Sequence, residues 1–203
     1  MVLYLLFFVS GAAALLYQVV WQRTLFAIYG INVESVTMVV TAFMLGLGLG
    51  SLAGGVVSKA TGRPVVLLFA LVEFLIGVFG SFSLVLLHGV GRVTLALAPS
   101  LVGLTTFLLV LVPTMLMGST LPLLVAHFTR RSKNVGRSVG ALYFVNTLGS
   151  AAASAAAVLA LLGTLGQSGT VRRAATLNFV ASAVAVALYV RARRAADAPG
   201  ELT

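Results

Sequence analysis

The chain has 203 residues, of which 60% are hydrophobic and 8% are charged, and its formal net charge is +9. A soluble domain of this length needs far more charge to cover its surface, so the composition excludes that class. Because the chain has no cysteine, disulfides, thiol nucleophiles and cysteine metal sites are excluded too. We expect no cofactor and no metal. The basic residues lie between apolar runs, so we expect no nucleic-acid partner either.

Six unbroken apolar runs reach the length of ~20 residues that a helix needs to cross a bilayer. They cover approximately residues 3–29, 33–58, 64–87, 100–128, 138–162 and 171–190. Continuous runs of this length favour helices over strands. The sequence therefore predicts an all-α integral membrane protein. Its six-transmembrane-helix bundle covers residues 1–190, and a polar cytoplasmic tail covers residues 191–203.

The first predicted helix carries polar side chains in its second half. Gln18 and Gln22 are four residues apart and share a face. Amides at this depth are expected to point into the bundle and to find partners there. Arg23 and Glu34 both lie toward the outer ends of their helices. Because charges inside membranes usually pair, we predict a structural ion pair between these two residues.

Aromatic side chains offer a second candidate feature. Tyr17 and Trp21 of the first predicted helix, with Tyr143 of the fifth, could form a wall around an ammonium ion. The alternative is that the rings anchor the helices at the membrane interface or pack in the core.

The second predicted helix contains a regular series of glycines. Gly46, Gly50 and Gly54 are four residues apart, so one face of the helix lacks side chains. Such a face lets a neighbouring backbone approach closely, and close packing holds membrane helices together. We interpret these glycines as a helix-packing seam; a pore or hinge is the alternative.

Glu73 is the strongest candidate for a functional group. It lies nine residues beyond Pro64, the start of the third predicted helix, and hence ~13 Å into the membrane at 1.5 Å per residue. An ionisable group at this depth suggests function by default, here a cation-binding or proton-coupled carboxylate. The alternative is a protonated or hydrogen-bonded structural residue, with Asn146 or a threonine as its partner. The candidate intramembrane polar site comprises Glu73, Gln18, Gln22, Trp21, Tyr17, Asn146 and Tyr143.

The later predicted helices contain breaks in their apolar pattern. Pro113 and Pro122 remove backbone donors from the fourth helix and bend it, either as a simple bend or as a gating kink. A glycine-rich turn over residues 163–170 is expected to separate the fifth helix from the sixth.

Basic residues are distributed unevenly over the predicted loops. Nine of them lie in the even-numbered loops and the tail, whereas three lie in the odd-numbered loops. Cytoplasmic loops carry the excess of Lys and Arg. We therefore expect a multi-pass protein of the cell's inner membrane with both termini in the cytoplasm.

Several segments resemble the transmembrane domain at the N-terminus of fused spermidine-synthase-like membrane proteins. They occur in the family's order and are Ser10–Arg23, Thr41–Gly55, Glu73 within LVEFLIG, Pro113–Leu124 and Val139–Ala153. The glycine helix with GGVVSKATGRP also resembles the loop between helices two and three of major facilitator transporters. The resemblance implies half of such a transporter, with six helices instead of twelve.

Two departures from that family limit what the resemblance implies. The family's cytosolic aminopropyltransferase domain has no counterpart before Thr203, so this chain alone is not expected to transfer aminopropyl groups. The family usually has a glutamate where this sequence has Gln18, and a neutral amide binds a cation less strongly than a carboxylate does. The resemblance therefore gives only weak support for a polyamine site.

Two classes of function follow from these observations. The first is a non-enzymatic membrane module that acts as an embedded subunit or anchor of a larger complex. Its partners would be membrane lipid and another membrane protein or a second copy of the chain. The resemblance also implies a cytosolic synthase-like partner. The alternative is an oligomeric half-transporter or binding module for a small cation such as a polyamine, which predicts uptake in proteoliposomes.

Overall fold

The computed structural model describes residues 1–30, 33–59, 64–94 and 99–197. Every regular element in these ranges is a helix. The elements are α1 (Val2–Tyr29), α2 (Val33–Lys59), α3 (Val65–Thr94), α4 (Pro99–Ser132), α5 (Val135–Ala156), a π-helical segment η1 (Ala157–Leu161) and α6 (Leu162–Asp197). The helix α4 continues through both of its prolines.

Within the described ranges, five helical stretches are long and apolar enough to cross a membrane. They are Val2–Ile28, Val39–Lys59, Val65–Val93, Gly103–Ser132 and Val135–Asp197. Length and composition thus make the chain a multi-pass helical membrane protein, as the sequence predicts at this coarser level. The count differs from the predicted six because α5, η1 and α6 follow one another as a single stretch of 63 residues.

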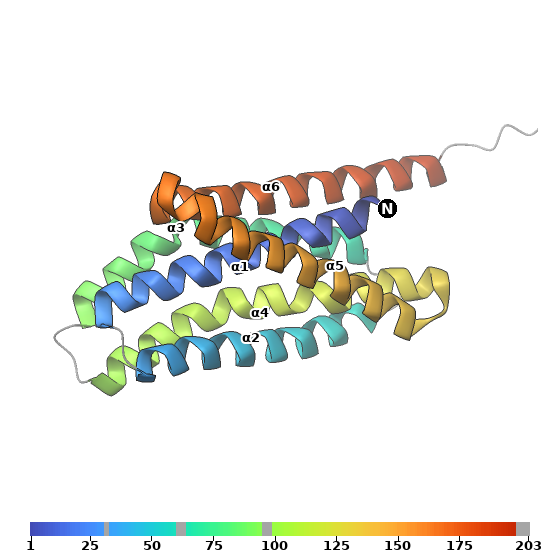
Figure 1. The fold of residues 1–203 in the computed structure, drawn as a ribbon. Coiled ribbons are helices and arrows are strands. Elements are labelled where there is room, and N and C mark those ends of the chain that lie inside the picture. The colour runs from blue at the N-terminus through green and yellow to red at the C-terminus, as the bar shows by residue number, and fades with distance from the viewer. Residues whose placement is uncertain (31–32, 60–63, 95–98, 198–203) are drawn as a thin grey trace, which may run out of the picture.

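A single residue interrupts this last stretch. The glycine-rich segment predicted as a turn is helical except at Gly166, whose backbone has φ 64° and ψ −171°. Glycine adopts positive φ without the steric cost that a Cβ imposes. Figure 1 shows α5 and α6 as two arms that fold back on each other at this end of the molecule. The predicted turn is therefore replaced by a sharp bend between two helical arms.

The helices run alternately between the two ends of the bundle (Figure 1). The side chains of Asn146 and Ser150 on α5 donate to the carbonyl oxygens of Phe7 and Gly11 on α1, at 3.2 and 3.0 Å. The residue numbers rise together along both helices, so α1 and α5 are parallel. The most extensive packing joins α2 with α4, α1 with α5, and α3 with α6.

Two clusters of buried side chains fill the interior. The larger includes Tyr17, Trp21 and Phe43. The smaller includes Phe69 and Leu142. Because the hydrocarbon of a bilayer is as apolar as leucine, these clusters stabilise the bundle through close packing more than through removal from water. They hold α1 at the centre, where it contributes to both.

Candidate functional site

Glu73 lies at the junction of three helices. Its side chain on α3 is 0% exposed. The hydroxyl of Ser10 on α1 donates to Oε1 at 2.5 Å, and the amide of Asn178 on α6 donates to Oε2 at 2.7 Å. Both carboxyl oxygens thus have a partner, and the group links α1, α3 and α6.

The electrostatic surroundings of Glu73 are neutral. Among the described residues it has hydrogen-bonding partners but no ion-pair partner. Burial of a charge without a counterion is costly, whereas hydrogen bonds offset part of that cost. The arrangement can hold the three helices together, and it can also exchange a proton or accept a small cation. The side-chain oxygen Oδ1 of Asn178 is buried and has no partner in the part of the chain that the structure describes.

The predicted aromatic residues of α1 lie in the core. Tyr17 and Trp21 are fully buried and stack with ring centroids 5.2 Å apart. The indole Nε1 of Trp21 donates to the hydroxyl of Ser83 at 2.9 Å. The ring of Tyr17 fits against Gly80, where a Cβ would overlap its hydroxyl oxygen. Tyr143 on α5 is 63% exposed, so the structure does not combine the three rings into one wall.

The remaining amides lie apart from Glu73. Asn146 donates to the backbone carbonyl of Phe7 and is therefore part of the α1–α5 contact. Gln18 and Gln22 are half-buried on α1. The partners of Glu73 are Ser10 and Asn178, not Asn146 or a threonine, which corrects the partner predicted from sequence. Asn178 could have been found by the criterion that selected Gln18, because it is a lone amide in an apolar run.

The predicted ion pair between Arg23 and Glu34 lies outside what can be described, because the side chain of Glu34 is not among the described residues. Arg23 is exposed on α1.

The glycines of α2 lie against α4. A Cβ on Gly50 would overlap the carbonyl oxygen of Met115, and a Cβ on Gly54 would lie 2.6 Å from that of Ser119. A Cβ on Gly46 would meet the side chain of Thr114 instead. All three predicted glycines therefore face one neighbouring helix, as a packing seam requires.

The α2–α4 seam is reciprocal, because α4 also contributes a glycine. A Cβ on Gly118 would overlap the carbonyl oxygen of Leu47, just as Gly50 meets Met115. Backbone-to-backbone approach of this kind permits Cα–H···O contacts between helices.

A second seam joins α1 with α5, and the sequence did not reveal it. A Cβ on Gly11 would overlap the carbonyl oxygen of Asn146, and a Cβ on Gly149 would overlap that of Phe8. Gly11 is the sole glycine of α1, and Gly149 lies nine residues beyond Gly140 in α5, so no four-residue spacing marks the seam in the sequence.

In the described residues, no group of three or more His, Asp or Glu side chains lies close enough together to hold a metal ion. Comparison of the chain with protein-family models, with curated proteins and with solved structures gave no significant match. The function must therefore be argued from the geometry.

Proposed function

We propose that this chain is a non-enzymatic six-helix membrane module that acts as an embedded subunit of a larger complex. In this proposal it is built like half of a major facilitator transporter, as in the membrane domain of spermidine-synthase-like proteins. The pair of reciprocal glycine seams within the chain supports the proposed architecture, and the observation that carries the proposed association is the open apolar surface of α5. The bend at Gly166 divides the last helical stretch into two arms of ~30 residues, each long enough to cross a bilayer.

The α1–α5 seam and the α2–α4 seam have the same geometry, as two copies of an inverted structural repeat would. In both, each glycine lies three residues after the residue whose carbonyl meets the opposite glycine. Exchanging α1 with α4, α2 with α5 and α3 with α6 converts the α1–α5 seam into the α4–α2 seam. The same exchange maps the α3–α4 contact onto the α6–α1 contact and leaves the α3–α6 pair in place. Because α1 and α4 run in opposite directions, the repeat is inverted, as in many transporters.

The sequence supports the same relation at one position. Leu49-Gly50-Ser51-Leu52-Ala53 on α2 and Leu148-Gly149-Ser150-Ala151-Ala152 on α5 share four of five residues, and the glycine of each is the seam glycine. These two helices are the ones that the proposed repeat exchanges.

The exposed faces of α2 and α5 support a need for a partner. In the most apolar 18 residues of the Val135–Asp197 stretch, only 17% of the residues are buried within the chain. The corresponding share is 33% or more in each of the other four stretches. A Cβ on Gly48 of α2 or Gly140 of α5 would meet nothing within 4 Å. Small residues on an open face allow another membrane helix to approach closely. A second copy or another membrane protein would complete the enclosure that six helices leave open.

Association can be tested on the chain extracted in gentle detergent. Gly48→Trp and Gly140→Trp are expected to reduce co-purification or self-association, measured by mass spectrometry of the intact particle. Leu71→Trp is the control, because Leu71 is an exposed residue of α3 on neither face. Finding only single chains in wild-type extracts, with no partner even after cross-linking in native membranes, would contradict the proposal.

The second candidate is a half-transporter for a small cation, and the specific observation in its favour is the fully buried carboxyl group of Glu73. An intramembrane carboxyl group without a counterion is the type of group that binds cations or protons in transporters. Glu73→Gln should then abolish uptake of a polyamine into proteoliposomes while assembly remains intact. Uptake at the wild-type rate in this variant would remove Glu73 from the transport site.

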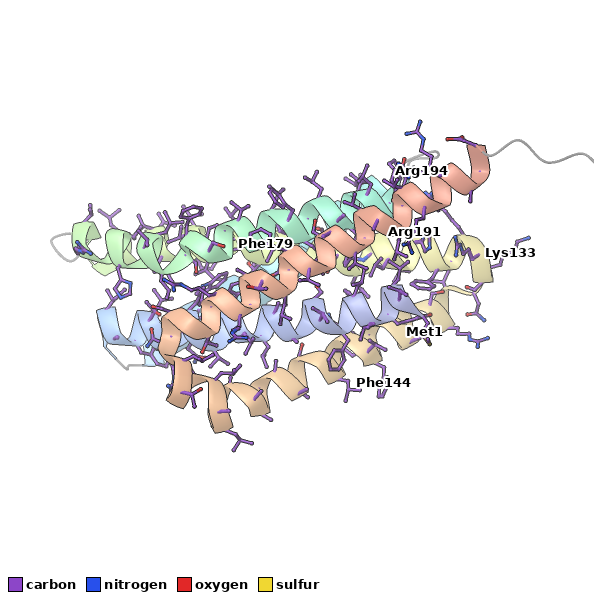
Figure 2. The ribbon with its side chains drawn as sticks, turned by 90° about the horizontal axis from the view of Figure 1, so that it is seen from above. Met1, Lys133, Phe144, Phe179, Arg191 and Arg194 are labelled. Atoms are coloured by element: carbon purple, nitrogen blue, oxygen red, sulfur yellow. The ribbon has the colours of Figure 1, made fainter. Side chains whose placement is uncertain are left out.

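For orientation, we propose that the basic end faces the cytoplasm of a cell with an inner membrane. Met1, Lys133, Arg191 and Arg194 lie at the same end of the bundle (Figure 2), which supports an arrangement with both chain ends on the cytoplasmic side.

A further inference from the structure

A cavity of about 580 Å³ opens at the basic end of the bundle, distant from Glu73 along the helices. The beginnings of α1 and α3 and the last turns of α4 and α6 form its wall. Its volume lies in the range of about 300–1,000 Å³ that is typical of pockets for small ligands.

The wall of the cavity combines two kinds of surface. Val2, Val66 and Leu188 line it with aliphatic side chains, and Arg130 and Arg131 contribute positive charge. An occupant that matches both surfaces needs an anionic group joined to an apolar segment. A free inorganic anion would match only the basic part of the wall, and a purely apolar molecule would match only the aliphatic part.

The depth of the cavity identifies the source of such a molecule. The apolar stretch Val65–Val93 begins at this cavity, and the stretch Gly103–Ser132 ends at it. It therefore lies where the hydrocarbon of a bilayer meets the head groups, which is the level of the lipid phosphates. Basic pockets between transmembrane helices on the cytoplasmic side bind anionic lipid head groups.

The charge balance of this end agrees with an anionic occupant. The first turn of α3 carries no acidic side chain, so the positive end of its dipole is not neutralised locally. Asp197, an acidic residue at this end of α6, lies 3.9 Å from Arg193, and both side chains are largely exposed. Arg130 also donates to the carbonyl oxygen of Ser58 at 2.9 Å, which fixes its side chain between α2 and α4.

We propose that this cavity is a binding site for one anionic phospholipid, with its phosphate at Arg130 and Arg131 and the start of an acyl chain along Val66 and Leu188. The site would tie the ends of α1, α3, α4 and α6 together through a molecule of the cytoplasmic leaflet.

The test measures lipid binding to the purified full chain in detergent by native mass spectrometry. Phosphatidylglycerol and phosphatidylcholine with identical acyl chains are compared, and the former should bind more tightly. Arg131→Gln should weaken phosphatidylglycerol binding roughly fivefold, the factor for one basic residue near a membrane surface. Arg194→Gln, which removes a basic residue at the same end but outside the cavity, should have no such effect.

A second pair of variants adds a charge without removing an arginine. Ala192→Glu places a carboxylate at the cavity and should weaken phosphatidylglycerol binding at least as much as Arg131→Gln. Ala196→Glu makes the same change one helical turn further along α6 and should leave binding unchanged. Both sites are exposed on a helix, so folding is preserved.

Three results would overturn the proposal. Equal binding of the two lipids would remove the role of charge. Equal effects of the cavity variants and their controls would show diffuse attraction instead of a site. Inorganic phosphate that displaces phosphatidylglycerol at millimolar concentration would show that the cavity takes a soluble anion and not a lipid.

Discussion

Substitution of alanine for Gly50 tests the α2–α4 seam directly. The added Cβ would overlap the carbonyl oxygen of Met115 and would lie 2.7 and 2.8 Å from its carbonyl carbon and Cα. Ordinary contacts begin at 3.4 Å, so relief of the contact with Cα alone requires about 0.6 Å, and the closer carbonyl oxygen requires a larger separation of the two helices. Because the obstacle is backbone, it cannot move aside as a side chain can.

The cost of this separation can be estimated. Overpacking in a well-packed interior costs about 1–3 kcal/mol, and a gap of 0.5–1 Å forfeits a quarter to a half of each dispersion contact across it. Alanine regains about 1 kcal/mol over glycine within a helix. Taking the upper cost, since the clash is with backbone, we expect Gly50→Ala to lower the free energy of unfolding by about 2 kcal/mol.

The assay is unfolding by sodium dodecyl sulfate from mild detergent, followed by circular dichroism. Gly48→Ala is the matched control in the same helix, because its Cβ would meet nothing within 4 Å. Gly46→Ala should fall between the two, because its obstacle is the side chain of Thr114. If Gly50→Ala is as stable as Gly48→Ala, the seam does not hold α2 against α4 and the reasoning fails.

Three further predictions concern the interior and the topology. Glu73→Leu should lower the free energy of unfolding by about 2–4 kcal/mol, since it leaves the buried hydroxyl of Ser10 and the amide of Asn178 unpaired. Glu73→Gln should lower it by about 1 kcal/mol, and equal unfolding midpoints of the two variants would contradict this reasoning. Trp21, the sole tryptophan, should show blue-shifted emission resistant to aqueous quenchers, and Trp21→Phe should cost about 1 kcal/mol through its bond to Ser83. In this cysteine-free chain, cysteines at Lys133 and Arg194 should react with an impermeant maleimide from the side opposite to one at Thr164. Reaction of the Lys133 and Arg194 cysteines from opposite sides would exclude the sixth crossing.

The composition of the chain was sufficient to predict the class of fold. Apolar runs of bilayer length admit few alternatives to helices, and the described residues are helical accordingly. The series Gly46, Gly50 and Gly54 was visible because its spacing repeats along one helix, whereas Gly11 and Gly149 form a seam only after two helices meet. Local patterns reveal a helix face, but they do not identify the helix that packs against it.

The partners of Glu73 show the same limit. Its depth in the membrane follows from counting residues, whereas its bonds to Ser10 and Asn178 depend on how three helices pack. The sixth helix was predicted to end near residue 190, but α6 continues for about two further turns. Residues up to Asp197 remain helical, and Arg193 and Asp197 are four apart and pair along the helix, which supports a polar end outside the apolar core.

The two glycine seams also explain how α2 and α5, the two helices that the proposed repeat exchanges, can differ over most of their sequence. On α2 the seam must bring its helix against α4 over several turns, which needs Gly46, Gly50 and Gly54. On α5 the contact with α1 is shared with hydrogen bonds from Asn146 and Ser150, so Gly149 is sufficient. Polar bonds and close backbone approach are alternative ways to join helices in lipid. Each arm of the proposed repeat relies on a different mixture of the two, and an inverted repeat can therefore persist in the packing after most of it has disappeared from the sequence.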